Sequence, residues 1–232
     1  MIKYKKILIT GCSSGLGHSL ANKLLENKNK IYCLGRDKLK RKDVKSVKCD
    51  LGNIKNIKKN LRKLLDTKNL DYVFLNAGIL GKIKNINKIS FSEIDEIFKI
   101  NVFSNKEILD YFIENNIKTK LIIAISSGAA LSPKTGWYLY CSSKSAFKFL
   151  IESYAQENTN RKFINISPGL IKTKMQKQIC KINEKKIPSV KKFKKLNKEN
   201  LVPSPDEVAQ NILRTIEKLN KKSGSYLDIR KK

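Results

Sequence analysis

Short apolar runs alternate along the chain with longer amphipathic segments, and this alternation limits the fold more than any other feature. The apolar runs have the length of buried strands and lie at residues 7–10, 31–34, 44–49, 72–75, 121–126, 163–166 and 226–229. Segments with helical periodicity lie at residues 16–27, 54–66, 91–115, 138–156 and 205–220. Strands joined through helices run parallel, with helices on both faces of the sheet. The sequence therefore predicts a doubly wound α/β fold with a seven-stranded parallel sheet.

The whole chain, residues 1–232, is predicted to form a single domain, because its length suits one domain and no repeat or flexible linker divides it. Residues 172–200 break the pattern, since lysines crowd there among apolar residues without clear periodicity. Such an insertion is either a mobile lid over a substrate or a solvated, charged excursion. The sequence leaves both possibilities open.

The formal net charge of +29 raises the possibility of nucleic-acid binding, because basic surfaces bind phosphate groups. The composition indicates another cause. The chain has 43 Lys, 22 Asn and 29 Ile but 8 Ala, as expected for an A+T-rich coding sequence, and 6 Arg, the residue that base and phosphate readers favour. We interpret the charge as coding bias, and expect no specific nucleic-acid partner.

No run of 18 apolar residues is present, so no membrane span is predicted. The five cysteines are odd in number and scattered, without the spacing or clustered histidines of a metal site. We therefore expect reduced thiols, no bound metal and a cytoplasmic protein.

A glycine-rich turn joins the first predicted strand to the first predicted helix. Residues 10–17 read Thr-Gly-Cys-Ser-Ser-Gly-Leu-Gly. Glycines allow the backbone to turn tightly against a pyrophosphate, and the N-terminus of the following helix attracts the anion. This pattern indicates a dinucleotide-binding Rossmann fold, although a glycine-rich turn alone can be purely structural.

Tyr140 and Lys144 form a candidate catalytic pair. A spacing of four on a helix puts the phenol and the ammonium on one face. With so many lysines, one or two such pairs among eight tyrosines are expected by accident. The pair therefore needs support from residues elsewhere in the chain.

That support comes from polar residues that end other predicted strands or lie on a helix. They are Asp50, Asn76-Ala77-Gly78, Asn101, Ser127, Pro168-Gly169 and Thr173. Ligands gather at the carboxyl ends of parallel strands, although each of these residues could also be a turn or helix-cap residue.

In order and spacing, these motifs resemble the short-chain dehydrogenase/reductase family over essentially the whole chain. The resemblance implies that Tyr140 is the proton donor, that Lys144 lowers its pKa and binds the nicotinamide ribose, that Ser127 binds the carbonyl oxygen, and that Asn101 supports a proton path. It also implies the cofactor-binding residues Gly11, Ser13, Ser14, Gly15, Leu16, Gly17, Arg36, Asp50, Leu51, Asn76, Ala77, Gly78, Tyr140, Lys144, Pro168, Gly169, Ile171 and Thr173. A homodimer or homotetramer is the assembly that the resemblance implies.

The second predicted strand ends in Gly35-Arg36 rather than in an acid. An acid there binds the ribose hydroxyls of NAD, whereas an arginine can accept the 2′-phosphate of NADP. We therefore expect NADP(H) to be preferred over NAD(H).

Within the family, residues 126–141 and 168–176 look like those of sepiapterin reductases and bacterial benzil reductases, which reduce one carbonyl of a vicinal diketone or a related side chain. The resemblance implies Ser127, Trp137, Met175 and Asp228 as substrate residues. Two alternatives remain: reduction of a 3-oxoacyl group on an acidic carrier protein, and a basic nucleic-acid-associated protein that keeps the fold without turnover.

Overall fold

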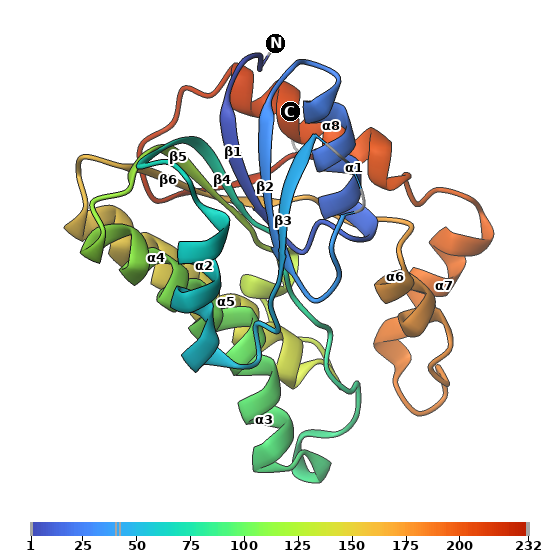
Figure 1. Cartoon of the computed structure of the whole chain (residues 1–232). Helices are drawn as coiled ribbons and strands as arrows, with labels where there is room; N and C mark the ends of the chain where they lie inside the picture. Colours follow the sequence, from blue (N-terminus) through green and yellow to red (C-terminus); the bar gives the residue numbers. More distant parts are fainter. Residues whose placement is uncertain (1, 40, 42, 231–232) are drawn as a thin grey trace.

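The computed structural model describes residues 2–39, 41 and 43–230, and its centre is a seven-stranded sheet in which every pairing is parallel (Figure 1). The strand order is β3-β2-β1-β4-β5-β6-β7. The strands are β1 (Lys6–Thr10), β2 (Lys30–Gly35), β3 (Val44–Lys48), β4 (Asn69–Leu75), β5 (Lys118–Ile125), β6 (Lys162–Ser167) and β7 (Ser225–Asp228). The predicted doubly wound fold is confirmed. Strands β2 and β3 are added on one side of β1, and β4 to β7 are added on its other side, so the strand order reverses between β1 and β4.

Helices cover both faces of the sheet (Figure 1). One face packs against α2 (Ile57–Leu64), α4 (Ser104–Glu114) and α5 (Tyr138–Glu157), and the other packs against α1 (Gly15–Leu25) and α8 (Pro205–Glu217). Short 3-10 turns lie at Ile54–Asn56, Ile86–Lys88, Gly128–Ala130 and Pro188–Val190. Each face buries a separate apolar cluster, so the central strands are apolar on both sides. Among the described residues, no helix is long and apolar enough to cross a membrane.

The single helix predicted over residues 91–115 is interrupted. Helix α3 spans Phe91–Phe98 and begins with a capping box between Ser90 and Glu93. A π-helix follows at Lys99–Phe103 and leads into α4. A π-turn adds a residue without ending the helix, and such turns are frequent at functional sites. Here the π-helix contains Asn101, one of the predicted site residues.

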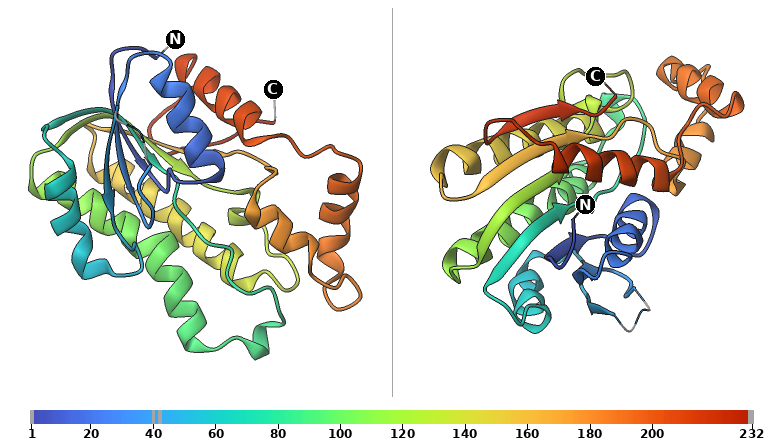
Figure 2. Two further views of the ribbon diagram at one scale, coloured as in Figure 1. Left: turned by 45° about the vertical axis from the view of Figure 1, so that its right-hand side comes forward. Right: turned by 90° about the horizontal axis from the view of Figure 1, so that it is seen from above.

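Residues 172–200, for which we predicted no regular structure, contain two helices. Helix α6 spans Lys174–Cys180 and α7 spans Lys191–Lys198. Together they extend to one side of the sheet (Figure 2). Trp137 holds the segment to the body, because its ring stacks on Phe193 with centroids 5.0 Å apart and its Nε1 donates to Ser189 Oγ at 2.9 Å.

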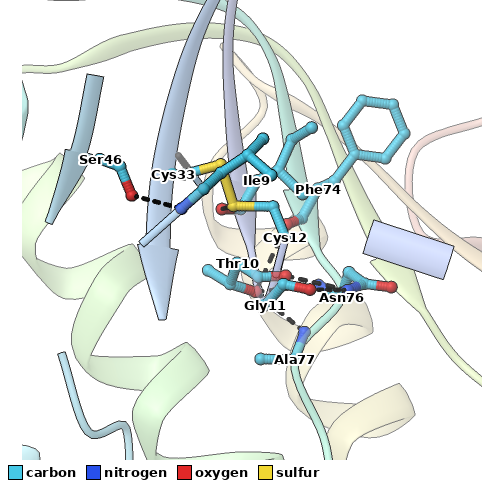
Figure 3. Close-up of a disulfide and its surroundings, with 10 residues drawn as sticks. Ile9, Thr10, Gly11, Cys12, Cys33, Ser46, Phe74, Asn76 and Ala77 are labelled. Carbon is cyan, nitrogen blue, oxygen red and sulfur yellow. Dashed lines mark hydrogen bonds between the residues drawn. A yellow bond between two sulfur atoms is a disulfide. The ribbon is translucent and has the colours of Figure 1, made fainter. Parts of the chain in front are cut away.

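The structure differs from the expectation that all cysteines are thiols, because Cys12 and Cys33 form a disulfide between the glycine-rich turn and β2 (Figure 3). Their Cα atoms are 6.1 Å apart, and both residues are buried. Cys12 and Cys33 are widely separated in the sequence, so the sequence gave no indication that their side chains meet. Cys49, Cys141 and Cys180 are free.

The ends of β1 and β4 are joined through one buried hydroxyl. Thr10 Oγ1 accepts hydrogen bonds from the backbone N–H groups of Asn76 at 2.9 Å and Ala77 at 3.0 Å. In return, Asn76 Nδ2 donates to the carbonyl oxygens of Thr10 and Gly11, at 2.9 and 3.2 Å (Figure 3). These contacts fix the ends of β1 and β4, the two strands between which the strand order reverses.

We expect Thr10→Val to lower the free energy of unfolding by about 1–3 kcal/mol, because it leaves the two backbone donors without their acceptor. The measurement is urea unfolding of the variant and its parent. Thr119→Val is the matched control, since Thr119 on β5 is equally buried and its Oγ1 has no partner among the described residues. Equal losses in the two variants would contradict the assigned role of the Thr10 hydroxyl.

Candidate active site

A cavity of about 1390 Å³ opens at the carboxyl ends of the strands. This volume exceeds the range of roughly 300–1,000 Å³ typical of sites for one small ligand. Its wall contains most of the predicted residues: Gly11, Ser13, Ser14, Gly15, Leu16, Arg36, Asp50, Leu51, Asn76, Ala77, Gly78, Ser127, Trp137, Tyr140, Lys144, Pro168, Gly169, Ile171, Thr173 and Met175. The structure therefore brings together residues from seven stretches of the chain in one cavity.

The glycine-rich turn has the shape that a pyrophosphate needs. Gly11 has a φ of +70°, in the left-handed region that favours glycine. A Cβ on Gly17 would lie 2.2 Å from the carbonyl oxygen of Gly11, so only glycine fits where the helix approaches the turn. Ser14 precedes α1 and makes no side-chain cap, which leaves N–H groups of the first turn available to an anion. The turn fits a dinucleotide.

Tyr140 and Ser127 face each other across the inner end of the cavity. Burial raises the pKa of Tyr140 to about 12, and a hydrogen bond with Ser127 opposes that rise. Ser127 Oγ also accepts from the backbone N–H of Ala129 at 3.1 Å. Burial is the largest of these effects, and the predicted lowering of the Tyr140 pKa by Lys144 stays a prediction. The phenol is therefore protonated at neutral pH.

Lys144 carries its ammonium into the interior, with a residue exposure of 4%. Its Nζ donates to the carbonyl oxygen of Ile125 at 2.8 Å and lies 5.9 Å from the ring centroid of Tyr140. Burial lowers the pKa of Lys144 to about 8. The ammonium thus remains mostly charged at pH 7, one helical turn from the phenol.

Asn101 lies behind the cavity wall rather than in it. Its Oδ1 accepts from the backbone N–H of Ile79 at 2.8 Å, and its Nδ2 donates to Ile79 O at 2.9 Å and to Ser143 Oγ at 3.0 Å. The amide is fully bonded to protein atoms. Asn101 therefore positions the segment after β4 against α5, and its predicted support of a proton path stays a prediction.

Two other predicted residues also lie outside the cavity wall. Gly17 packs against Gly11 and Asn76, as expected for a residue that shapes the turn. Asp228 forms an ion pair with Arg230, which itself lines the cavity. The predicted contact between Asp228 and a substrate stays a prediction, since the residue that reaches the cavity from this turn is Arg230.

Several lining residues were not predicted from the sequence. They are Leu80, Lys82, Ile83, Lys84, Lys134, Gln176, Gln178, Ser189, Lys192, Phe193, Leu196 and Arg230. Half of them come from residues 172–200 and therefore depend on how that segment folds back. The lysine-rich sequence of this segment carries no local pattern that could have identified them.

Fold and site together define a dinucleotide-dependent enzyme. The model of the short-chain dehydrogenase family matches residues 5–184, and the chain belongs to this family. It is accordingly an oxidoreductase of a family that uses NAD(P) cofactors.

Known relatives extend this finding. The chain is similar to benzil reductase ((S)-benzoin forming) of Bacillus subtilis, at 28% identity over 96% of this chain and 97% of the relative. It is similar to sepiapterin reductase of Rattus norvegicus, at 26% identity over 95% and 94%. A solved structure of ElxO with NADP bound has a TM-score of 0.78, with 23% identity over 97% of both chains, and shows the same fold.

We expect Lys144→Met to stabilise the protein at pH 7 by up to about 3 kcal/mol, because a shift of one pKa unit corresponds to about 1.4 kcal/mol and the pKa falls from 10.5 to about 8 on folding. Because the Lys144 pKa is lower in the folded protein, the unfolded chain binds more protons than the folded protein between pH 8 and 10.5. The free energy of unfolding of the parent therefore rises with pH over this range. The advantage of the variant should therefore shrink as pH rises through this range.

Chemical denaturation of both proteins at pH 7 and at pH 9.5 measures this difference. Lys148→Met is the control, since Lys148 lies one turn further along α5, is partly exposed and pairs with Glu152. A stability difference between Lys144→Met and the parent that does not change with pH would contradict the buried charge.

Proposed function

We propose that the protein is an NADP(H)-dependent reductase that converts a carbonyl group, in a ketone or vicinal diketone, to an alcohol. The observation that carries the proposal is the convergence of Ser127, Tyr140 and Lys144 on one wall of the cavity, with a protonated phenol beside a buried ammonium. A proton donor, a polar group for the carbonyl oxygen and a fixed positive charge are the groups that such a reduction requires.

The residues divide the reaction between them. A bound nicotinamide supplies the hydride, and the glycine-rich turn and Lys144 would hold the cofactor. Ser127 donates a hydrogen bond to the carbonyl oxygen, where negative charge develops. Tyr140 transfers its phenolic proton to that oxygen. The Lys144 ammonium stabilises the phenolate that results, because the site is buried and its charges are poorly screened.

We expect Tyr140→Phe to lower kcat by about 10²–10⁴-fold or more, the range that positioned general acids contribute. Affinity for NADPH should change little, because the ring remains. Oxidation of NADPH with benzil as substrate measures the rate. Tyr138→Phe is the control, since Tyr138 lies on the same helix but is 37% exposed and outside the cavity wall. A parent-like rate for Tyr140→Phe would overturn the assignment.

The cofactor preference rests on Arg36, which is exposed at the cavity and follows β2. A guanidinium there can bind the 2′-phosphate with two hydrogen bonds.

We expect NADPH to be preferred over NADH, and Arg36→Asp to lower kcat/KM for NADPH by about 10–100-fold, the value of charge-assisted hydrogen bonds. The value for NADH should change much less. Arg62→Asp is the control, because Arg62 is exposed on α2 away from the cavity and its substitution changes net charge equally. Equal use of both cofactors by the parent would count against the preference.

We further propose that residues 172–200 act as a lid. Helices α6 and α7 contribute apolar side chains to the cavity wall, including Met175, Ile179 and Phe193. Trp137 and Ser189 anchor the segment at one point, so closure would exclude water around the reacting groups.

Amide hydrogen exchange of α6 and α7 is expected to slow when NADP⁺ and a carbonyl analogue are both bound, because closure orders these helices. Helix α8 serves as the internal reference, since it packs against α1 on the other face of the sheet. Unchanged exchange in α6 and α7 in the ternary complex would show that the segment is a fixed excursion.

A further inference from the structure

The turn after β7 carries a guanidinium into the cavity. Arg230 lines the cavity, and Asp228 holds its side chain through two hydrogen bonds: Nε donates to Oδ1 at 2.8 Å and Nη2 donates to Oδ2 at 2.5 Å. The backbone N–H of Arg230 also donates to Asp228 Oδ1, at 3.1 Å. Because this pairing is bidentate, it fixes the plane of the guanidinium as well as its position.

Two glycines make room for the Arg230 side chain beside the catalytic groups. It lies over Gly169, where an added Cβ would be 2.6 Å from Arg230 Cδ. Its Nη2 lies 3.9 Å from the position that a Cβ would take on Gly128, the residue after Ser127. A guanidinium has five N–H donors, and Asp228 accepts from two of them. The remaining donors belong to a side chain that lines the same cavity as Ser127 and Tyr140.

The charge of the surrounding wall points the same way. Lys134, Lys174 and Lys192 also line the cavity, and no described carboxylate lies within ion-pair distance of them. Lysine is common throughout the chain, so its presence alone is weak evidence. The informative feature is the lack of acids: Asp50, which follows β3, is the one acidic residue among the described residues of the wall. A concave surface of uncompensated positive charge attracts anions.

We propose that Arg230 binds an anionic group of the substrate, and that the substrate is a carbonyl compound with an apolar body and a carboxylate. The apolar body suits Trp137, Ile179 and Phe193, which form one packed cluster beside Tyr140. The carboxylate suits the free edge of the fixed guanidinium. This inference rests on the proposed carbonyl reduction and gives that reaction a substrate class that the neutral diketone benzil does not represent.

The kinetic test compares two substrates with the same reactive group, benzil and benzil with a 4-carboxylate. In the parent, we expect kcat/KM with NADPH to be at least about tenfold higher for the carboxylate, from charge-assisted hydrogen bonds. Arg230→Met should remove that preference, because kcat/KM falls further for the carboxylate than for benzil. Arg214→Met is the matched control, because Arg214 is exposed on α8, lies outside the cavity wall, and its loss lowers net charge equally.

Binding gives a second measurement that does not depend on turnover. Calorimetry with NADP⁺-loaded protein should show biphenyl-4-carboxylate binding about tenfold more tightly than biphenyl-4-carboxamide, and Arg230→Met should abolish the difference. Because removal of Arg230 leaves Asp228 without this partner, Arg230→Gln is tested alongside; the amide can still donate to Asp228, and the same loss is expected. Thermal unfolding confirms that each variant is folded.

The outcomes separate the two proposals. A carboxylate preference in binding, lost in both Arg230 variants, together with no reduction of either benzil, would support the anion site and refute carbonyl reduction of this class. Equal use of the two benzils and equal binding of the two biphenyls would overturn the anion site and leave the reductase proposal intact. A preference that persists in both Arg230 variants, or a loss of NADPH affinity in them without a change of preference, would also overturn it.

Discussion

Helix α5 is held against the segment that follows β4 because one buried amide bonds to both. Asn101 accepts from and donates to the backbone of Ile79, in the segment that follows β4, and it also donates to Ser143 on α5. Ser143 Oγ in turn donates to the carbonyl oxygen of Tyr140 at 3.0 Å. The amide thus couples the segment after β4, where Ile79 borders the cavity, to the helix that carries the phenol and the ammonium. The π-helix at Lys99–Phe103 contains Asn101 and places its amide among backbone groups that need hydrogen-bond partners.

Most of the fold could be predicted from the sequence because its signals are local. Buried strands appear as apolar runs, and all seven were found close to their true ends. The break at Lys99–Phe103 was missed because apolar periodicity continues through a π-turn, while the hydrogen bonds that involve Asn101 come from residues distant in sequence. The Cys12–Cys33 disulfide was missed for a related reason, since only the register of β1 against β2 brings the two residues together.

The residues of the candidate site also divide into those that local sequence signals predict and those that depend on long-range contacts. Motif residues at strand ends and in the glycine-rich turn could be placed from order and spacing, because parallel strands deliver their carboxyl ends to one edge. The part of the cavity wall formed by residues 172–200 and by Arg230 could not be predicted from the sequence. Phe193 reaches the cavity through a stacking contact with Trp137, and Arg230 through contacts with Gly169 and Asp228. A lysine-rich segment and an isolated arginine carry no local pattern that predicts such contacts.

In this lysine-rich chain, burial distinguishes Lys144 from the many lysines at the surface. A coding bias places lysines readily at exposed positions, where a charged side chain keeps its water and affects stability little. Lys144 differs, because it is the one lysine among the described residues that the fold buries. Removing an ammonium from water destabilises the folded state, and the lowered pKa measures that penalty. One hydrogen bond to Ile125 O offsets it in part. A composition bias alone gives no reason to bury such a charge beside a phenol, whereas the proposed proton transfer from Tyr140 does, because a nearby cation would stabilise the phenolate left behind.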